Sequence, residues 1–273
     1  MALCAPEAFF HVQDLVIEPA AGGYVVGWSS QTVAQAPFWG HLQRLGSAGE
    51  LAGARADLVP GGGGEAQRRI SIVPLPDGTL SAVWNQRSPY YPFTYSIYTR
   101  HFDAGLHGLT APTQLADTLQ ASDFAVSAAP IGANIGLSWA GTTQSGQSEV
   151  RTAVIAPEAS VAGPFDTAAA TYQVSDVRVL PSGAGPFGVL WQEVRGYSRG
   201  TNAYLHLQHH SATGAATDAQ TELNGRAVYW VSELTGEYVQ AGQGIAVAGP
   251  DGHLVVTYQS ADQTQPNQYL FGR

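Results

Sequence analysis

Five short apolar runs that each end in a large aromatic residue constrain the fold of this chain more than any other feature. The aromatic residues recur at intervals of 52 to 67 residues, and a turn rich in Gly, Pro, Asp or Ala precedes each run. These anchor residues are Trp28, Trp84, Trp139, Trp191 and Tyr258. Apolar alternation bounded by such turns is typical of β-strands. The spacing therefore predicts one sheet motif repeated five times.

The copy around Trp84 shows the motif most clearly. Ile70–Pro74 forms a short β-branched run, a Pro-Asp-Gly turn leads into residues 79–84, and residues 95–102 alternate again. A weaker fourth segment follows in most copies. Four strands in a unit of about 50 residues are typical of propeller blades. We predict an all-β chain that forms a single domain over residues 1–273, a five-bladed β-propeller with four strands per blade.

The blade boundaries follow from the repeats. The predicted blades cover residues 14–59, 69–116, 123–167, 176–223 and 244–273. The fifth copy ends in its third strand, and an open sheet edge leaves backbone groups unpaired. We expect residues 8–13 (AFFHVQ) to supply the missing outer strand and so to close the ring with an N-terminal strand.

The second copy carries Val83-Trp84 followed by Tyr98, Arg100, Phe102 and Gly105. This pattern resembles a repeat of bacterial surface and secreted proteins, and in that repeat these residues are structural. In blade number and size the chain resembles five-bladed lectins of the tachylectin kind, in architecture only, because their sugar-binding motifs are missing. Five-bladed glycosidases share the same architecture, which by itself implies no activity.

Composition limits the partners. A net charge of −9 without a cluster of arginines argues against nucleic acid, and no apolar stretch is long enough for membrane insertion. One cysteine permits neither an internal disulfide nor a thiolate metal cluster. His206 and His210 would share a strand face while His209 points away, so no metal site is predicted. We also expect no cofactor.

The residue before each predicted inner strand should lie at the mouth of the propeller channel. In register these residues are Asp14, Arg69, Asp123, Asp176 and Gly244. Converging carboxylates shift one another's pKa values and can divide acid and base roles, as glycosidases require. Resemblance to five-bladed glycosidases adds a glutamate as the acid, and Glu193 is the nearest candidate. In the alternative interpretation these residues only solvate the mouth, with Arg69 neutralising an aspartate.

Aromatic residues gather in the loops that the same face should carry. With Arg69, they are the predicted ligand-binding residues: Trp39, Tyr90, Tyr91, Phe93, Tyr197 and Trp230. Flat rings near polar groups suit stacking on sugars or anchoring of a protein. Alternatively, the rings pack over the blade edges and hold long loops in place.

These features favour a non-catalytic binding or adhesion module that recognises a glycan or a protein surface. One alternative is a glycoside hydrolase or lyase that uses Asp14, Asp123, Asp176 and Glu193. Another is a structural subunit that forms a homo-oligomer or a larger assembly. We expect an extracellular, cell-surface or virion location, although the first residues, MALCAPEAFFHVQ, do not read as a signal peptide. A Ser/His/Asp triad would leave no local signature, and no motif points to one.

Overall fold

The computed structural model describes residues 11–32, 36–61, 65–88, 94–118, 125–142, 147–156, 161–170, 173–181, 186–197, 200–222, 227–229, 245–248, 254–257 and 270–272. Every regular element among them is a β-strand, so the predicted all-β class is confirmed. The chain divides into two compact units, Met1–Ala133 and Asn134–Arg273.

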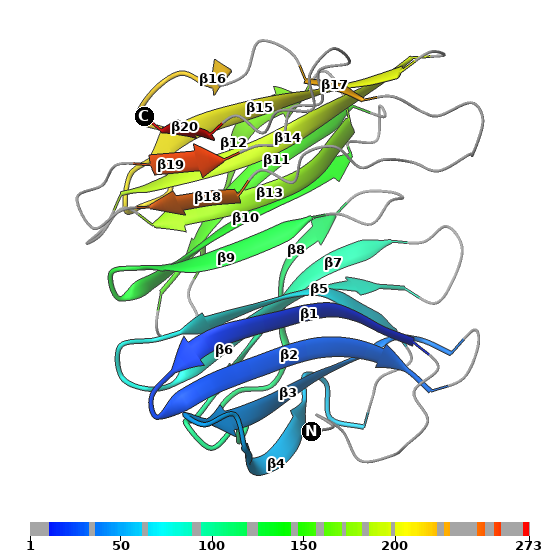
Figure 1. The fold of residues 1–273 in the computed structure, drawn as a ribbon, viewed down its shortest axis with the longest axis vertical. Coiled ribbons are helices and arrows are strands. Elements are labelled where there is room, and N and C mark those ends of the chain that lie inside the picture. The colour runs from blue at the N-terminus through cyan, green and yellow to red at the C-terminus, as the bar shows by residue number, and fades with distance from the viewer. Residues whose placement is uncertain are drawn as a thin grey trace. The chain divides into compact units, whose positions relative to one another are not determined.

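The first unit contains two four-stranded antiparallel sheets whose strand order follows the chain (Figure 1). The first sheet consists of β1 (His11–Ala20), β2 (Gly23–Gln31), β3 (Trp39–Gly46) and β4 (Leu51–Asp57). The second consists of β5 (Ala66–Pro74), β6 (Leu80–Arg87), β7 (Tyr95–Phe102) and β8 (Thr113–Thr118). A further strand, β9 (Val126–Ile131), lies beside β5, where the Ala128 backbone N–H donates to Ser71 Oγ at 3.1 Å.

The second unit has the same antiparallel organisation. Three strands, β10 (Asn134–Thr142), β11 (Ser148–Ile155) and β12 (Val161–Ala170), pair in chain order. The largest sheet contains β13 (Gln173–Pro181), β14 (Phe187–Tyr197), β15 (Gly200–His210) and β16 (Thr221–Glu222), and β17 (Ala227–Tyr229) also pairs with β15. A last sheet contains β18 (Ile245–Ala248), β19 (Leu254–Thr257) and β20 (Leu270–Gly272). The predicted four-stranded antiparallel sheet is therefore confirmed as the recurring element.

The expected closing strand is wrong for residues 11–13. His11, Val12 and Gln13 belong to β1, where they pair with Gln31, Ser30 and Ser29 of β2. The reason is an irregularity after Gln13, which shifts the register by one residue and lets β1 continue past Asp14. Residues 8–10 lie outside the described part of the chain.

The described anchor tryptophans form the interior of the sheets. Trp28, Trp84, Trp139 and Trp191 are each at most 2% exposed. Trp84 joins Val25, Leu42, Ile72 and Phe102 in one apolar cluster between the two sheets of the first unit. Gly40 permits close packing there, because a Cβ on this residue would lie 2.4 Å from Leu58 Cδ1. Burial of these aromatic and β-branched side chains is the main stabilising contribution.

Candidate active site

The first strands of three sheets carry a bulge at the positions predicted to face the channel mouth. The register shifts between Gln13 and Val16 in β1, between Arg68 and Ser71 in β5, and between Val174 and Asp176 in β13. Asp14, Arg69 and Asp176 therefore lie within strands, rather than just before them as predicted. The expected position is corrected because a bulge absorbs the irregular residue without ending the strand.

Asp14 and Arg69 share an unusual backbone conformation. Each has a φ of +54°, in the left-handed region that residues with a side chain rarely occupy. Apart from glycines, Leu106 is the remaining residue of positive φ in the described ranges. A residue held in such a conformation costs about 1–3 kcal/mol and is common at active sites. The bulges therefore mark Asp14 and Arg69 as functional candidates on their own evidence.

Asp14 is a half-buried carboxylate with a defined donor. Ser29 Oγ donates to Asp14 Oδ2 at 2.9 Å from the neighbouring strand β2. In the first unit β1 also lies beside β5, and Arg68 Nη2 donates to Gln13 Oε1 across the two strands. Arg69, the next residue, is exposed. A carboxylate and a guanidinium thus occupy the same register position on neighbouring first strands.

Asp176 has a cationic partner on its own strand. Arg178 Nε donates to Asp176 Oδ2 at 3.2 Å, and Asp176 Oδ1 accepts from the Val177 backbone N–H at 3.0 Å. Both side chains are about two-fifths exposed. This carboxylate is therefore paired with a guanidinium and remains accessible to solvent. Asp123, its predicted counterpart in the third repeat, lies outside the described residues.

Glu193 is buried in the sheet that contains β13–β16. It follows Trp191 by two residues and lies on the same face of β14. Its Oε1 accepts from Trp191 Nε1 at 3.4 Å and lies 3.4 Å from His206 Nε2, and the rings of Trp191 and His206 stack. Gln220 Nε2 donates to His206 Nδ1 at 2.8 Å, which places the imidazole proton on Nε2, toward Glu193. Burial lowers the pKa of His206, which favours this neutral ring.

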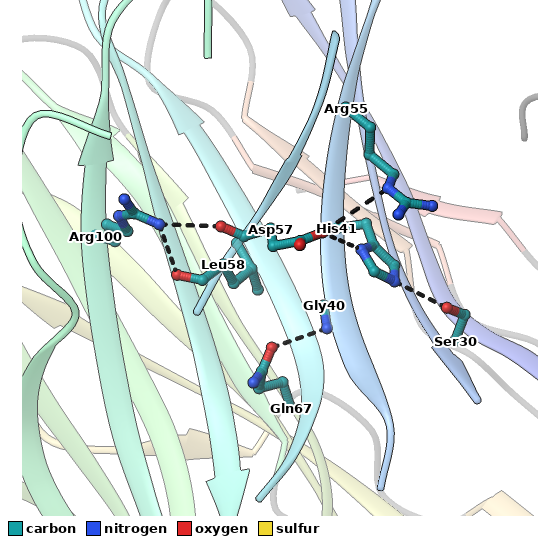
Figure 2. A network of polar contacts seen from close by, with 8 residues as sticks. All are labelled: Ser30, Gly40, His41, Arg55, Asp57, Leu58, Gln67 and Arg100. Atoms are coloured by element: carbon teal, nitrogen blue, oxygen red, sulfur yellow. Dashed lines mark hydrogen bonds and ion pairs between the residues drawn. The ribbon is translucent and has the colours of Figure 1, made fainter. Parts of the chain in front are cut away.

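A Ser–His–Asp chain that no local sequence motif predicts crosses the first sheet (Figure 2). Ser30 Oγ lies 2.9 Å from His41 Nε2, and His41 Nδ1 donates to Asp57 Oδ1 at 2.7 Å. Ser30 is only 1% exposed, so its hydroxyl cannot reach a substrate. The chain therefore connects β2, β3 and β4 as a structural link. The hydrogen bond from His41 is the largest cause of the lowered pKa of Asp57.

A small pocket opens beside this link. Its volume is about 120 Å³, and Trp39, His41, Arg55, Asp57 and Gln67 contribute to its wall. Arg100 fixes the strand end behind it, because its Nη1 donates to the backbone oxygens of Asp57 at 3.0 Å and Leu58 at 3.1 Å. Trp39 is the one predicted aromatic residue whose side chain the structure describes, and it lines this pocket.

The other predicted ligand-binding rings lie outside the described side chains. This group comprises Tyr90, Tyr91, Phe93 and Trp230, and also Tyr197, of which only the backbone in β14 is described. Within the described residues no group of three or more His, Cys, Asp or Glu side chains could hold a metal ion. No helix in that part of the chain is long and apolar enough to cross a membrane.

Comparison with known proteins identifies the fold. The chain is similar to an α-L-arabinanase of Penicillium chrysogenum complexed with arabinobiose, with a TM-score of 0.63, 12% identity and coverage of 94% of this chain and 78% of that one. It is also similar to an α-L-arabinofuranosidase of Fusarium graminearum in complex with an iminosugar inhibitor. The TM-score is 0.58 and the identity 11%, with coverage of 92% of this chain and 76% of that one. A Hadza microbial sialidase is similar with a TM-score of 0.59 and 8% identity. The match covers 92% of this chain and 53% of the sialidase, so the chain spans about half of that enzyme.

No protein-family model matches the sequence, and neither does any curated protein. The three similar structures are β-propeller glycoside hydrolases, and they support a propeller-like fold for this chain. The expectation of a non-catalytic binding or adhesion module is therefore wrong, because these neighbours are glycoside-cleaving enzymes and favour the hydrolase alternative. Nor do they support the lectin, virion or structural-subunit expectations. What the comparisons establish is a propeller-like fold shared with enzymes that cleave glycosidic bonds.

Proposed function

We propose that the chain is a glycoside hydrolase that acts on a glycan, with Asp14 as one of its catalytic carboxylates. The observation that carries the proposal is the left-handed conformation of Asp14 at the bulge of β1, on a fold that known glycosidases also use. Strain of this kind persists where surrounding structure fixes a side chain for a purpose. The hydrogen bond from Ser29 keeps the carboxylate oriented.

Glycoside hydrolysis requires a second carboxyl group, because one group protonates the leaving oxygen while the other acts as base or nucleophile. The sequence analysis names three candidates for it, Asp123, Asp176 and Glu193, and the variants below test each of them separately. Asp176 is the more accessible candidate, since 40% of its side chain is exposed. Glu193 is the less accessible of these candidates, because only 5% of its side chain is exposed. Arg69, exposed on the strand next to Asp14, would orient a substrate hydroxyl.

The test uses the full chain and a panel of arabinan, aryl α-L-arabinofuranosides, other aryl glycosides and sialosides. The variants are Asp14→Asn, Asp123→Asn, Asp176→Asn and Glu193→Gln, and the matched control is Asp77→Asn in the turn between β5 and β6. We expect Asp14→Asn and one other variant to lose about 10²–10⁴-fold in kcat. The control keeps the acceptor that Asp77 offers to Thr79 and should keep full activity.

Two results would overturn the proposal. One is a folded wild-type chain that cleaves no member of the panel. The other is a cleavage rate that Asp14→Asn leaves unchanged, with folding of both proteins verified by circular dichroism. The same proposal includes a five-bladed ring, which agrees with the five anchor residues. It also includes an extracellular location, which agrees with a glycan substrate. A crystal structure of the full chain would test the blade count.

A further inference from the structure

The bulges of β1 and β5 are connected directly by one side chain. Arg68 of β5 donates from Nη2 to Oε1 of Gln13 in β1. Each of these two residues directly precedes a residue of positive φ, Asp14 in β1 and Arg69 in β5. Because β1 and β5 belong to different sheets, this hydrogen bond restrains the position of one bulge relative to the other.

The guanidinium of Arg68 also contacts the end of the loop between β2 and β3. Its Cζ lies over the ring of Phe38, 5.3 Å from the ring centre. The neighbouring residue Gln67 attaches this loop to β5, because its backbone N–H donates to the Phe38 oxygen at 2.7 Å and its Oε1 accepts from the Gly40 N–H at 2.9 Å. Arg68 therefore contacts both Gln13 and an aromatic ring that is fixed to its own strand.

A planar guanidinium suits both contacts at once. It can place its flat face on an aromatic ring while its N–H groups donate in the plane, whereas the ammonium of a lysine is a compact point charge. The attraction between Arg68 and Phe38 is of the cation–π kind. The side chain of Arg68 is half-buried, which holds it more firmly than a fully exposed one.

The bulge of β1 is held from its other neighbour as well. Ser29 of β2 donates from Oγ to Asp14 Oδ2 at 2.9 Å, and the same atom lies 3.3 Å from the backbone oxygen of Gln13. Ser29 is fully buried. A bulge interrupts the regular ladder of backbone hydrogen bonds, so side-chain contacts of this kind decide its geometry. Ser29 supplies the contact from β2, and Arg68 supplies the one from β5.

We propose that Arg68 is a positioning residue that couples the two bulges and so fixes the carboxylate of Asp14 relative to the guanidinium of Arg69. The inference rests on the proposed hydrolase function, in which Asp14 is catalytic and Arg69 orients the substrate. Arg68 acts through Gln13 and Phe38 and does not contact the substrate. A displacement of about 1 Å in a catalytic site can cost about 10²-fold in rate, so the loss of this coupling should lower kcat more than it changes KM.

The experiment measures hydrolysis of the substrate panel by the full chain and by Arg68→Met, Arg68→Lys and Gln13→Leu. We expect kcat to fall about ten- to a hundredfold in Arg68→Met and in Gln13→Leu. Since both substitutions break the same hydrogen bond, the double variant should lose little more than either single one. Arg68→Lys keeps the charge without the planar group and should recover only part of the loss.

Arg44→Met is the matched control, because Arg44 also joins the first two sheets through its guanidinium. It donates to the backbone oxygens of Ala21 and Ala104, which lie in turns away from the bulges. Its removal should leave kcat unchanged. Denaturation midpoints of all variants verify that the chains are folded under the conditions of the assay.

A second measurement does not depend on activity. The ¹³Cα and ¹³Cβ chemical shifts of Asp14 and Arg69 depend on the backbone φ, and NMR of the ²H,¹³C,¹⁵N-labelled full chain records them. We expect these shifts to move in Arg68→Met and in Gln13→Leu, because each bulge then loses its contact with the other. They should stay as in wild type in Arg44→Met.

The two measurements separate this inference from the hydrolase proposal. If wild type hydrolyses the panel while kcat or the shifts in Arg68→Met equal those of wild type, the positioning role is overturned and the hydrolase stands. If wild type hydrolyses nothing while the shifts move as expected, the coupling of the bulges is supported and the hydrolase is overturned. Full kcat in Arg68→Lys would contradict the contact with Phe38, since charge alone would then suffice. An equal loss of kcat in Arg44→Met would show that any link between the sheets has this effect, and would also overturn the inference.

Discussion

The first sheet and the sheet of β13–β16 each contain a tryptophan opposite a histidine. The two sheets differ in where the carboxylate near the histidine lies. In the first sheet Trp28 of β2 pairs directly with His41 of β3, and their ring centroids are 5.4 Å apart. In the other sheet Trp191 of β14 pairs with His206 of β15, also at 5.4 Å. A polar residue two positions after each tryptophan then contacts the histidine.

The two sheets differ in which strand supplies the carboxylate. In the first sheet Ser30 follows the tryptophan, and Asp57 comes from the outer strand β4 with 42% of its side chain exposed. In the other sheet the carboxylate within 3.4 Å of the histidine is that of Glu193, which follows the tryptophan and is 5% exposed. The outer strand β16 places Glu222 opposite His206, and Gln220 contacts the ring. One ring pair can therefore hold an acid at the surface, where solvent can reach it, or in the interior. The comparison separates a solvent-accessible position from a buried one.

The largest expected effect is shared by both sheets, because it removes what they have in common. Trp28→Ala and Trp191→Ala should each lower the free energy of unfolding by about 3–5 kcal/mol, since both indoles are almost fully buried. Urea denaturation followed by circular dichroism measures the change. Trp28→Phe and Trp191→Phe keep an aromatic ring and should cost less. A difference of more than about 2 kcal/mol between the two alanine variants would contradict the equivalence of the anchors.

The next effect should distinguish the sheets. Glu193→Ala removes an acceptor from the Nε2–H of His206 and from the indole N–H of Trp191, and should cost about 1–3 kcal/mol. Glu193→Gln keeps an acceptor oxygen and should restore most of that loss. Equilibrium denaturation at pH 7 compares the variants with wild type. Equal stability of Glu193→Ala and wild type would show that the buried carboxylate contributes nothing to folding.

The residues of the ring pairs could be predicted from the sequence, and their connections could not. Alternating apolar residues that end at Trp28 and Trp191 indicate buried strand positions, because successive side chains of a strand alternate between its faces. Once His41 and His206 are placed opposite these tryptophans, the pairs follow. The contact of His41 with Asp57 depends on an irregular register between β3 and β4, at Leu42 and Arg44. Gly53, with a φ of +75° inside the shifted part of β4, is a sequence signal for a bulge there, but it does not say which residue meets His41.

For the bulges, too, the positions could be predicted from the sequence, and the backbone conformation could not. Spacing from the anchors selected Asp14, Arg69 and Asp176, and the structure has a bulge next to each of them. Their conformation could not be predicted, because positive φ is signalled most strongly by Gly, and here it falls on an aspartate and an arginine. The pairing of His11–Gln13 with β2 followed from the bulge in β1 and was missed for the same reason.

The acid dependence of stability should differ between the two sheets. Burial lowers the pKa of His206 below its ordinary value of 6.5, so at lower pH the unfolded chain gains a proton that the folded chain resists. Protonation of His206 therefore does not affect stability above about pH 6.5. Below that pH the free energy of unfolding falls, until the pH passes the pKa of His206 in the folded chain. Asp57, with a pKa lowered from 3.8, loses its contribution only in stronger acid. Denaturation midpoints measured between about pH 7 and pH 5 should fall less in His206→Gln than in wild type.

A suitable control for that measurement is Val12→Ala, an exposed side chain without an ionisable group, whose slope over the same range should match wild type. Burial also lowers the pKa values of His101 and His210, so His206→Gln reduces the slope without abolishing it. A slope in His206→Gln identical to that of wild type would show that the imidazole beside Glu193 is not held neutral by burial.

The smallest expected effect is that of Asp57→Asn on stability at pH 7. The carboxylate is about two-fifths exposed, and solvent screens its interactions with His41 and Arg55. The asparagine oxygen can still accept from His41 Nδ1, so the free energy of unfolding should fall by no more than about 1 kcal/mol. Urea denaturation beside Glu193→Ala makes the comparison direct. A loss in Asp57→Asn as large as that in Glu193→Ala would mean that the exposed acid stabilises its sheet as the buried one does. Asp57 would then be a structural group like Glu193, and the contrast between an acid accessible to solvent and an acid fixed in the interior would fail.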